Sequence, residues 1–220
     1  MKLLAIETST EACSAALFLD GMIGSRYKIA PRQHAELILP MVDELLAEAE
    51  LKISNLDCLA FGRGPGAFTG VRIATGVIQG LAFAADLPVI PVSTLAILAQ
   101  GAISRANNLI SAIDARMGEI YWGLFQVQQD IVTPVSAESV SSPEQLAAPS
   151  DRRWFGIGSG WITYAKELQQ AVNDNLIGNQ GESYPHARDI IPLAIRAYTK
   201  GEAVPAEQAL PVYLRNQVTG

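Results

Sequence analysis

The stretch from Gly62 to Gly80 constrains the fold more than any other part of this chain. Its sequence is GRGPGAFTGVRIATGVIQG, in which an apolar strand runs into a glycine-rich loop and the loop runs into a helix. Glycine reaches positive φ without a steric penalty and proline fixes its own φ, so the loop predicts a tight turn or a close backbone approach. A glycine inside a helix costs roughly 1 kcal/mol relative to alanine. The helix glycines Gly70, Gly76 and Gly80 therefore predict that another backbone packs closely on this helix.

Two common phosphate-binding loops do not match this stretch. A Walker loop ends in Gly-Lys-Ser/Thr, whereas Val71 and Arg72 follow Gly70 here. The dinucleotide fingerprint G-x-G-x-x-G is also incomplete. If it starts at Gly62, its last position is Ala67, and if it starts at Gly64, its last position is Thr69. The pattern favours a packing helix with a tight turn before it over a ligand-binding loop.

The elements around this stretch predict a ribonuclease-H-like lobe. Three apolar runs come first, with Asp20-Gly21 as a hairpin signal between the second and third. Helices and strands then alternate, with helices at residues 34–51, 68–85 and 93–106 and strands at 56–62 and 89–92. A meander followed by right-handed parallel crossovers describes the ribonuclease-H-like architecture, which actin-like folds use in duplicate.

The second half of the chain repeats this order. Residues 109–114 form an apolar run that ends at Asp114, as the first strand ends at Glu7. Strands are expected at 119–127, 131–140 and 154–157, and helices at 161–172 and 186–198; residues 173–184 are expected to form a loop, and 211–215 to be the one tail segment that packs. We therefore predict an α/β protein with a duplicated ribonuclease-H-like (actin-like ATPase) fold, divided into lobes 1–106 and 107–220.

Charge and composition narrow the function. Sixteen basic residues against 22 acidic residues give a formal net charge of −6, the wrong sign for a protein that holds nucleic acid by itself. A partner would therefore have to hold any RNA. The two cysteines lie in apolar runs, which indicates buried thiols in a reducing cytoplasm. No signal peptide or membrane span is expected, because the opening apolar run is short and prolines interrupt the longest uncharged stretch.

Two polar segments at strand ends are candidates for a phosphate or nucleotide site. In a duplicated ribonuclease-H-like fold, Glu7-Thr8-Ser9 and Asp114-Ala115-Arg116 would face each other across a cleft, where carboxylates can orient Mg²⁺ and hydroxyls and arginine can contact phosphate. The alternative is that both carboxylates cap strand ends and pair locally. His34 and His186 lack a nearby His or Cys at metal-ligand spacing, and no G-x-S-x-G motif is present. No catalytic or metal-binding residue is predicted.

Four blocks resemble the TsaB family, also called YeaZ. They are LAIETS at residues 4–9, GRGPGAFTGVRIATGVIQGLAFA at 62–84, IDARMGEIYW at 113–122 and YLR at 213–215, so the resemblance spans essentially the whole chain. The resemblance implies a bacterial cytosolic protein with the actin-like ATPase fold. It also implies that the protein is required for making threonylcarbamoyladenosine at position 37 of tRNAs that read ANN codons. In this role it would act as a partner of the catalytic paralogue TsaD, and the ATPase TsaE would join the assembly.

The resemblance also implies a loss of catalysis. TsaD carries two metal-binding histidines, and the matching positions here are Thr94 and Leu98, neither of which can ligate a metal. The chain thus resembles a pseudo-enzyme that needs no cofactor, with weak ATP or ADP binding as a further expectation. The alternative is a small ATP-dependent, kinase-like enzyme that works from the Glu7 and Asp114 cleft.

The family uses its first two helices as a partner surface. The helix at 34–51 has an apolar arc of roughly 200°, wider than one core needs, and periodicity alone leaves open whether another lobe or a second protein covers it. Carried over from the family, the interface with TsaD, or with a second copy when TsaD is absent, is predicted to contain Ile38, Met41, Leu45, Gly70, Ile73, Val77, Gly80 and Ala84.

Overall fold

The computed structural model describes residues 1–215 and divides the chain into two compact units. Among the described residues, unit 1 contains Met1–Ile97 and Pro185–Val212, and unit 2 contains Leu98–Tyr184 and residues 213–215. This division differs from the predicted boundary at 106/107. The last helix returns to unit 1 because its apolar side packs on the sheet of that unit.

Unit 1 is built on a five-stranded mixed sheet. The strands are β1 (Lys2–Glu7), β2 (Ala12–Leu19), β3 (Met22–Ile29), β4 (Cys58–Gly62) and β5 (Val89–Val92), in the order β3-β2-β1-β4-β5. The first three are antiparallel neighbours, and Asp20 and Gly21 make the predicted hairpin turn with positive φ. β4 and β5 join in parallel beside β1. This is the predicted meander with parallel crossovers.

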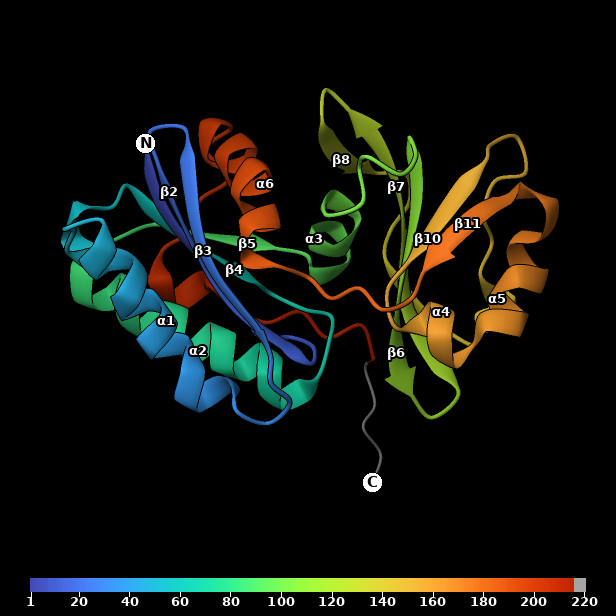
Figure 1. Ribbon diagram of the computed structural model, residues 1–220, viewed down its shortest axis with the longest axis horizontal. Helices are drawn as coiled ribbons and strands as arrows, with labels where there is room; N and C mark the ends of the chain where they lie inside the picture. Colours follow the sequence, from blue (N-terminus) through green and yellow to red (C-terminus); the bar gives the residue numbers. More distant parts are fainter. Residues whose placement is uncertain (216–220) are drawn as a thin grey trace. The chain divides into compact units, whose positions relative to one another are not determined.

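Helices cover both faces of this sheet (Figure 1). α1 (His34–Glu48) and α2 (Phe68–Ala85) pack on one face and share a core with β1, β2 and β4, while α6 (Ala187–Thr199) packs on the other face. α3 (Thr94–Gln100) follows β5, and short 3-10 helices lie at Ile53–Asn55 and Ala206–Gln208. Within residues 1–215, α2 is the one helix long and apolar enough to cross a membrane. One side of α2 is buried at Val71, Ala74 and Ile78, and the last two belong to the core of unit 1.

The segment after α6 covers the β5 edge of the sheet. Val204 and Val89 exchange two backbone hydrogen bonds of 2.8 and 2.9 Å. Further along, Ala209 is fully buried in the unit 1 core, and the Val212 amide donates to the Arg63 carbonyl at 2.8 Å. Val212 supports the predicted packing of residues 211–215, but the expectation that this is the one tail segment that packs was wrong, because Val204 and Ala209 also pack on unit 1.

Unit 2 repeats the topology of unit 1. Its strands are β6 (Asn108–Arg116), β7 (Glu119–Gln128), β8 (Ile131–Pro134), β9 (Ser139–Ser141), β10 (Trp154–Ile157) and β11 (Leu176–Gln180), with the path β11-β10-β6-β7-β8 and β9 beside β7. β6 corresponds to β1, since each lies between an antiparallel and a parallel neighbour. α4 (Gly160–Thr163) and α5 (Ala165–Val172) cover a core containing Trp122, Trp154 and Trp161, and 3-10 helices lie at Pro143–Gln145 and Asn173–Asn175. The duplicated ribonuclease-H-like fold is thus confirmed.

Three sequence-based boundaries in unit 2 were wrong. Residues 173–184 contain β11 instead of being only a loop; its sequence LIGNQ lies at the sheet edge and is mostly exposed, so it lacks the apolar pattern of a buried strand. The strand expected at 131–140 is two short strands. The helix expected at 161–172 is interrupted at Tyr164, whose φ and ψ of −125° and 40° are not helical.

Candidate functional site

The predicted site residues of unit 1 form a buried loop at the end of β1. Oε1 of Glu7 accepts a hydrogen bond from the Ser9 backbone amide at 2.6 Å and another from the Ser9 hydroxyl. The Ser9 hydroxyl also lies 3.0 Å from Oγ1 of Thr94, at the start of α3. The Thr8 hydroxyl donates to the Gly70 carbonyl at 2.7 Å. The loop is therefore tied to the first turns of both α2 and α3.

Glycines allow this loop to approach its neighbours. A Cβ added to Gly62 would overlap Oε2 of Glu7, and one added to Gly70 would overlap the Thr8 carbonyl oxygen. The Ala67 amide donates to the Ser9 carbonyl at 2.7 Å, which closes the contact between the two loops. The prediction of close backbone packing is confirmed at Gly70, with the β1 loop of the same unit as the packing partner.

Glu7 is a carboxylic acid in an environment that disfavours its charge. Its side chain is fully buried, and Oε2 has no hydrogen-bond partner among the described residues. Burial raises the pKa of Glu7 to about 7, although the hydrogen bonds from Ser9 and Thr8 partly oppose this rise. Near neutral pH the residue is therefore divided between neutral and ionised forms.

The hydroxyls of Thr8 and Ser9 are already engaged within unit 1. Glu7, Thr8 and Ser9 are all fully buried, and each hydroxyl has a partner in the surrounding loops. Their predicted contact with a phosphate stays a prediction, and it would require these hydrogen bonds to break. Thr94 was not identified as part of this network from the sequence, although its position directly after the strand beside β4 is a signal that could have suggested it.

In unit 2, Asp114 pairs with groups close to it in the chain. Its Oδ1 accepts from the Arg116 amide at 2.8 Å, and its Oδ2 lies 3.1 Å from the Arg116 guanidinium. The Tyr164 hydroxyl lies 3.4 Å from Oδ1, and burial together with the Asp114 charge raises the pKa of Tyr164. The Asp114 amide donates to the Ser159 hydroxyl at 3.1 Å. Local pairing, the alternative left open by the sequence, is what unit 2 shows at Asp114.

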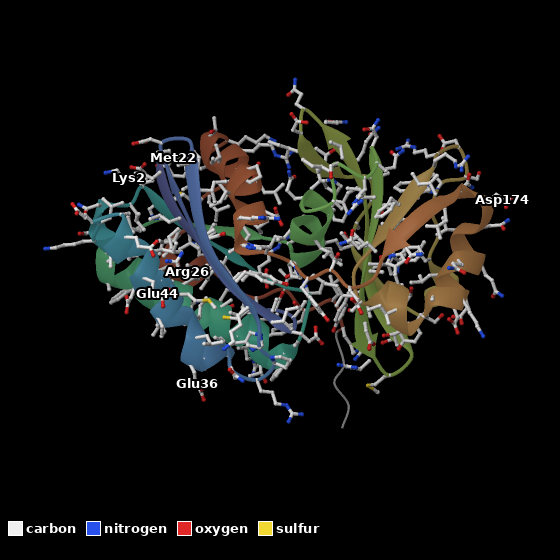
Figure 2. The ribbon with its side chains drawn as sticks, in the orientation of Figure 1. Lys2, Met22, Arg26, Glu36, Glu44 and Asp174 are labelled. Atoms are coloured by element: carbon white, nitrogen blue, oxygen red, sulfur yellow. The ribbon has the colours of Figure 1, made fainter. Side chains whose placement is uncertain are left out.

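Half of the predicted partner-surface residues are interior. Ile38, Met41 and Leu45 of α1 are at most 8% exposed and pack into the unit 1 core, and Gly70 is buried against the β1 loop. Their assignment to a partner surface was wrong, because the sheet and α2 use most of the apolar arc of α1. The outer side of α1 is instead acidic: Glu36 points away from the ribbon, and Arg26 of β3 reaches Glu44 at 2.8 Å (Figure 2).

The open surface of α2 contains the remaining predicted residues. Ile73 and Val77 are half-buried at its border, whereas Gly80 and Ala84 are exposed. A Cβ added at Gly76 or Gly80 would meet nothing within 4 Å, and Phe83 is 85% exposed. The outer face of α2 therefore combines glycine steps with a large unpacked aromatic ring, and we call Gly76, Gly80, Phe83 and Ala84 the α2 outer face.

Comparison with known proteins identifies the family. The family model described as "TsaD: tRNA N6-adenosine threonylcarbamoyltransferase" matches residues 24–218. The tRNA threonylcarbamoyladenosine biosynthesis protein TsaB of Escherichia coli K12 is 41% identical over 225 residues, covering 99% of this chain and 96% of the relative. The chain belongs to the TsaB family.

Further members agree with this assignment along the whole chain. The TsaB protein of Haemophilus influenzae Rd is 42% identical over 232 residues, covering 100% of this chain and 95% of the relative. The solved structure described as "YeaZ from Pseudomonas aeruginosa" is 50% identical, with a TM-score of 0.90 over 97% of this chain and 99% of that one. The resemblance of the four sequence blocks to TsaB is confirmed, and so is the fold that it implied.

Proposed function

We propose that this TsaB-family chain is a non-catalytic subunit in the formation of threonylcarbamoyladenosine at position 37 of tRNAs that read ANN codons. In this proposal the chain binds the catalytic paralogue TsaD, and TsaE joins the assembly. The names of its relatives place them in this biosynthesis. The match to the TsaD family model over residues 24–218 supports a common architecture with the proposed partner.

The α2 outer face is the observation that carries the proposal. Glycine inside a helix is unfavourable unless something packs on it, and nothing described lies within 4 Å of the Cβ positions of Gly76 and Gly80. Beside them, Phe83 exposes most of its ring, whose burial in an interface would be favourable. A helix of a partner protein, able to approach these glycines closely, would account for both features. In the absence of TsaD, the α2 outer face of a second copy would pack on this face, which gives the predicted homodimer.

The non-catalytic role is supported by the residues at the strand ends. The Thr94 hydroxyl is hydrogen-bonded to Ser9, and Asp114 is paired with Arg116.

With a net charge of −6, the chain would meet tRNA through the complex and not by itself. The proposed location of this complex is the cytoplasm.

A reconstitution experiment tests this proposal. The purified chain would be incubated with ATP alone, and then with TsaD, TsaE, an activated threonylcarbamoyl donor and an ANN-decoding tRNA. We expect no sustained ATP turnover by the chain alone, and tRNA modification that depends on adding the chain to TsaD and TsaE. Sustained turnover by the isolated chain would support the kinase-like alternative and contradict the subunit proposal. Calorimetric titration with ADP would separately test the predicted weak nucleotide binding.

A further inference from the structure

The turn between β6 and β7 has a backbone that its sequence does not favour. Arg116, Met117 and Gly118 all have positive φ, at 63°, 57° and 77°. Glycine adopts this conformation readily, but Arg116 and Met117 carry a Cβ that makes it unfavourable. The turn is also exposed, since Met117 is 83% exposed at its tip. Other contacts must therefore stabilise this conformation.

On the β6 side, the Asp114 carboxylate provides such contacts. It accepts a hydrogen bond from the Arg116 amide at 2.8 Å and pairs with the Arg116 guanidinium at 3.1 Å. These bonds fix the first residue of the turn. They do not reach Met117 or Glu119.

On the β7 side, Arg215 provides the contacts. One terminal nitrogen of its guanidinium, Nη2, forms an ion pair with the Glu119 carboxylate and also lies 3.4 Å from the Arg116 carbonyl oxygen. Its other terminal nitrogen lies 3.8 Å from the Met117 sulfur. Arg116 and Glu119 are directly paired across the two strands, so one side chain links both sides of the turn. The Arg215 side chain is only 21% exposed, and a planar guanidinium suits such a multiple contact better than an ammonium group does.

We propose that Arg215 is a clasp that orders the Arg116–Gly118 turn, so that the C-terminal segment acts as a strap on unit 2. Docking of the segment and order in the turn then form one cooperative element. When the clasp is closed, Met117 is presented to solvent in a fixed orientation. When it is open, the left-handed turn is free to relax. This inference is independent of the proposed function, because it concerns contacts within unit 2 alone.

Hydrogen exchange of the full chain, measured by mass spectrometry, tests the clasp. Arg215→Ala and Glu119→Gln are each expected to speed exchange of the amides at 116–119 by roughly fivefold, the effect of losing one partly buried ion pair. Arg215→Lys should give an intermediate rate, because lysine keeps the charge but cannot make all the contacts. The matched control is Arg188→Ala, which removes an exposed arginine paired with Asp189 on α6, and it should leave the turn unchanged.

The ε-methyl resonance of Met117 provides a second measurement. The chain has four methionines, so the signal can be assigned by substitution. We expect it to move toward the position of a free methionine in Arg215→Ala but not in Arg188→Ala. Unchanged exchange at 116–119 in Arg215→Ala would overturn the proposal. Equal acceleration throughout β6 and β7 would also overturn it, since that result would mean that the contact stabilises unit 2 in general.

Discussion

The carboxyl group of Glu7 lies directly against the backbone of Gly62, so closely that a Cβ on Gly62 would overlap Oε2. Both residues lie at the ends of their strands, β1 and β4, which are parallel neighbours. The buried carboxyl group of Glu7 therefore requires a glycine at position 62. This requirement links the first block of the family resemblance to the second.

Substitution of Gly62 should be far more harmful than substitution of a glycine on the outer face of α2. Gly62→Ala would force the Glu7 carboxyl or the β4 backbone to move, and should destabilise unit 1 by about 3 kcal/mol. Gly76→Ala is the matched control: its Cβ meets nothing, and the gain in helix propensity should stabilise the chain by up to about 1 kcal/mol. Urea denaturation measures both. A Gly62→Ala variant as stable as the wild type would contradict this prediction, because it would show that the Glu7 side chain can move away from the added Cβ at little cost.

Glu7 should make the stability of unit 1 depend on pH. Burial raises its folded pKa to about 7, above the ordinary value of 4.5, so the folded chain binds this proton more tightly than the unfolded chain does. The resulting stabilisation is complete below about pH 4.5 and is lost as the pH rises to about 7. At most about 3 kcal/mol is involved. Glu7→Gln cannot ionise, so its advantage over the wild type should grow between pH 5 and pH 8 in urea denaturation. Parallel pH profiles of the two proteins would contradict the assignment.

Removal of the Ser9 hydroxyl should have a pH-dependent effect through Glu7. Ser9→Ala takes away a donor to Oε1 of Glu7 and leaves Thr94 with one partner fewer. Because the hydrogen bond from the Ser9 hydroxyl lowers the pKa of Glu7, its loss should raise that pKa further. We expect a destabilisation of about 1–3 kcal/mol at pH 8 and a smaller one at pH 5. Ser25→Ala, on the edge strand β3, is the control and should show no such difference.

Binding to TsaD should depend on the α2 outer face. Gly80→Glu places a charged side chain where nothing in unit 1 obstructs it, so the chain should fold normally but bind TsaD at least about tenfold more weakly. Gln170→Glu introduces the same residue at an exposed position of α5 and should bind as the wild type does. Isothermal titration calorimetry gives both affinities, and circular dichroism checks the fold. An unchanged affinity in Gly80→Glu would exclude this face as the docking surface. Val77→Glu is a poorer test, because Val77 packs on the unit 1 core.

The order of elements was predictable because it depends on local patterns. Hairpin signals such as Asp20-Gly21, apolar runs that end in Glu7 and Asp114, and the glycine-rich junction at residues 62–70 all act over a few residues. They were enough for the duplicated fold and for most strand bounds in unit 1. β11 escaped prediction because an exposed edge strand gains its stability from backbone pairing with β10, which leaves no apolar pattern in the sequence.

Local residue patterns were enough to predict the family, the two repeated sheets and the residues at the strand ends. What those residues contact depends on how distant segments fold together. Periodicity gave α1 a wide apolar arc but could not say that the sheet and α2 bury Ile38 and Leu45, since burial depends on distant segments. In the same way, the glycines of α2 have one local pattern and two roles: Gly70 admits the loop after Glu7, whereas Gly80 faces open space. That difference depends on which parts of the folded chain reach each glycine.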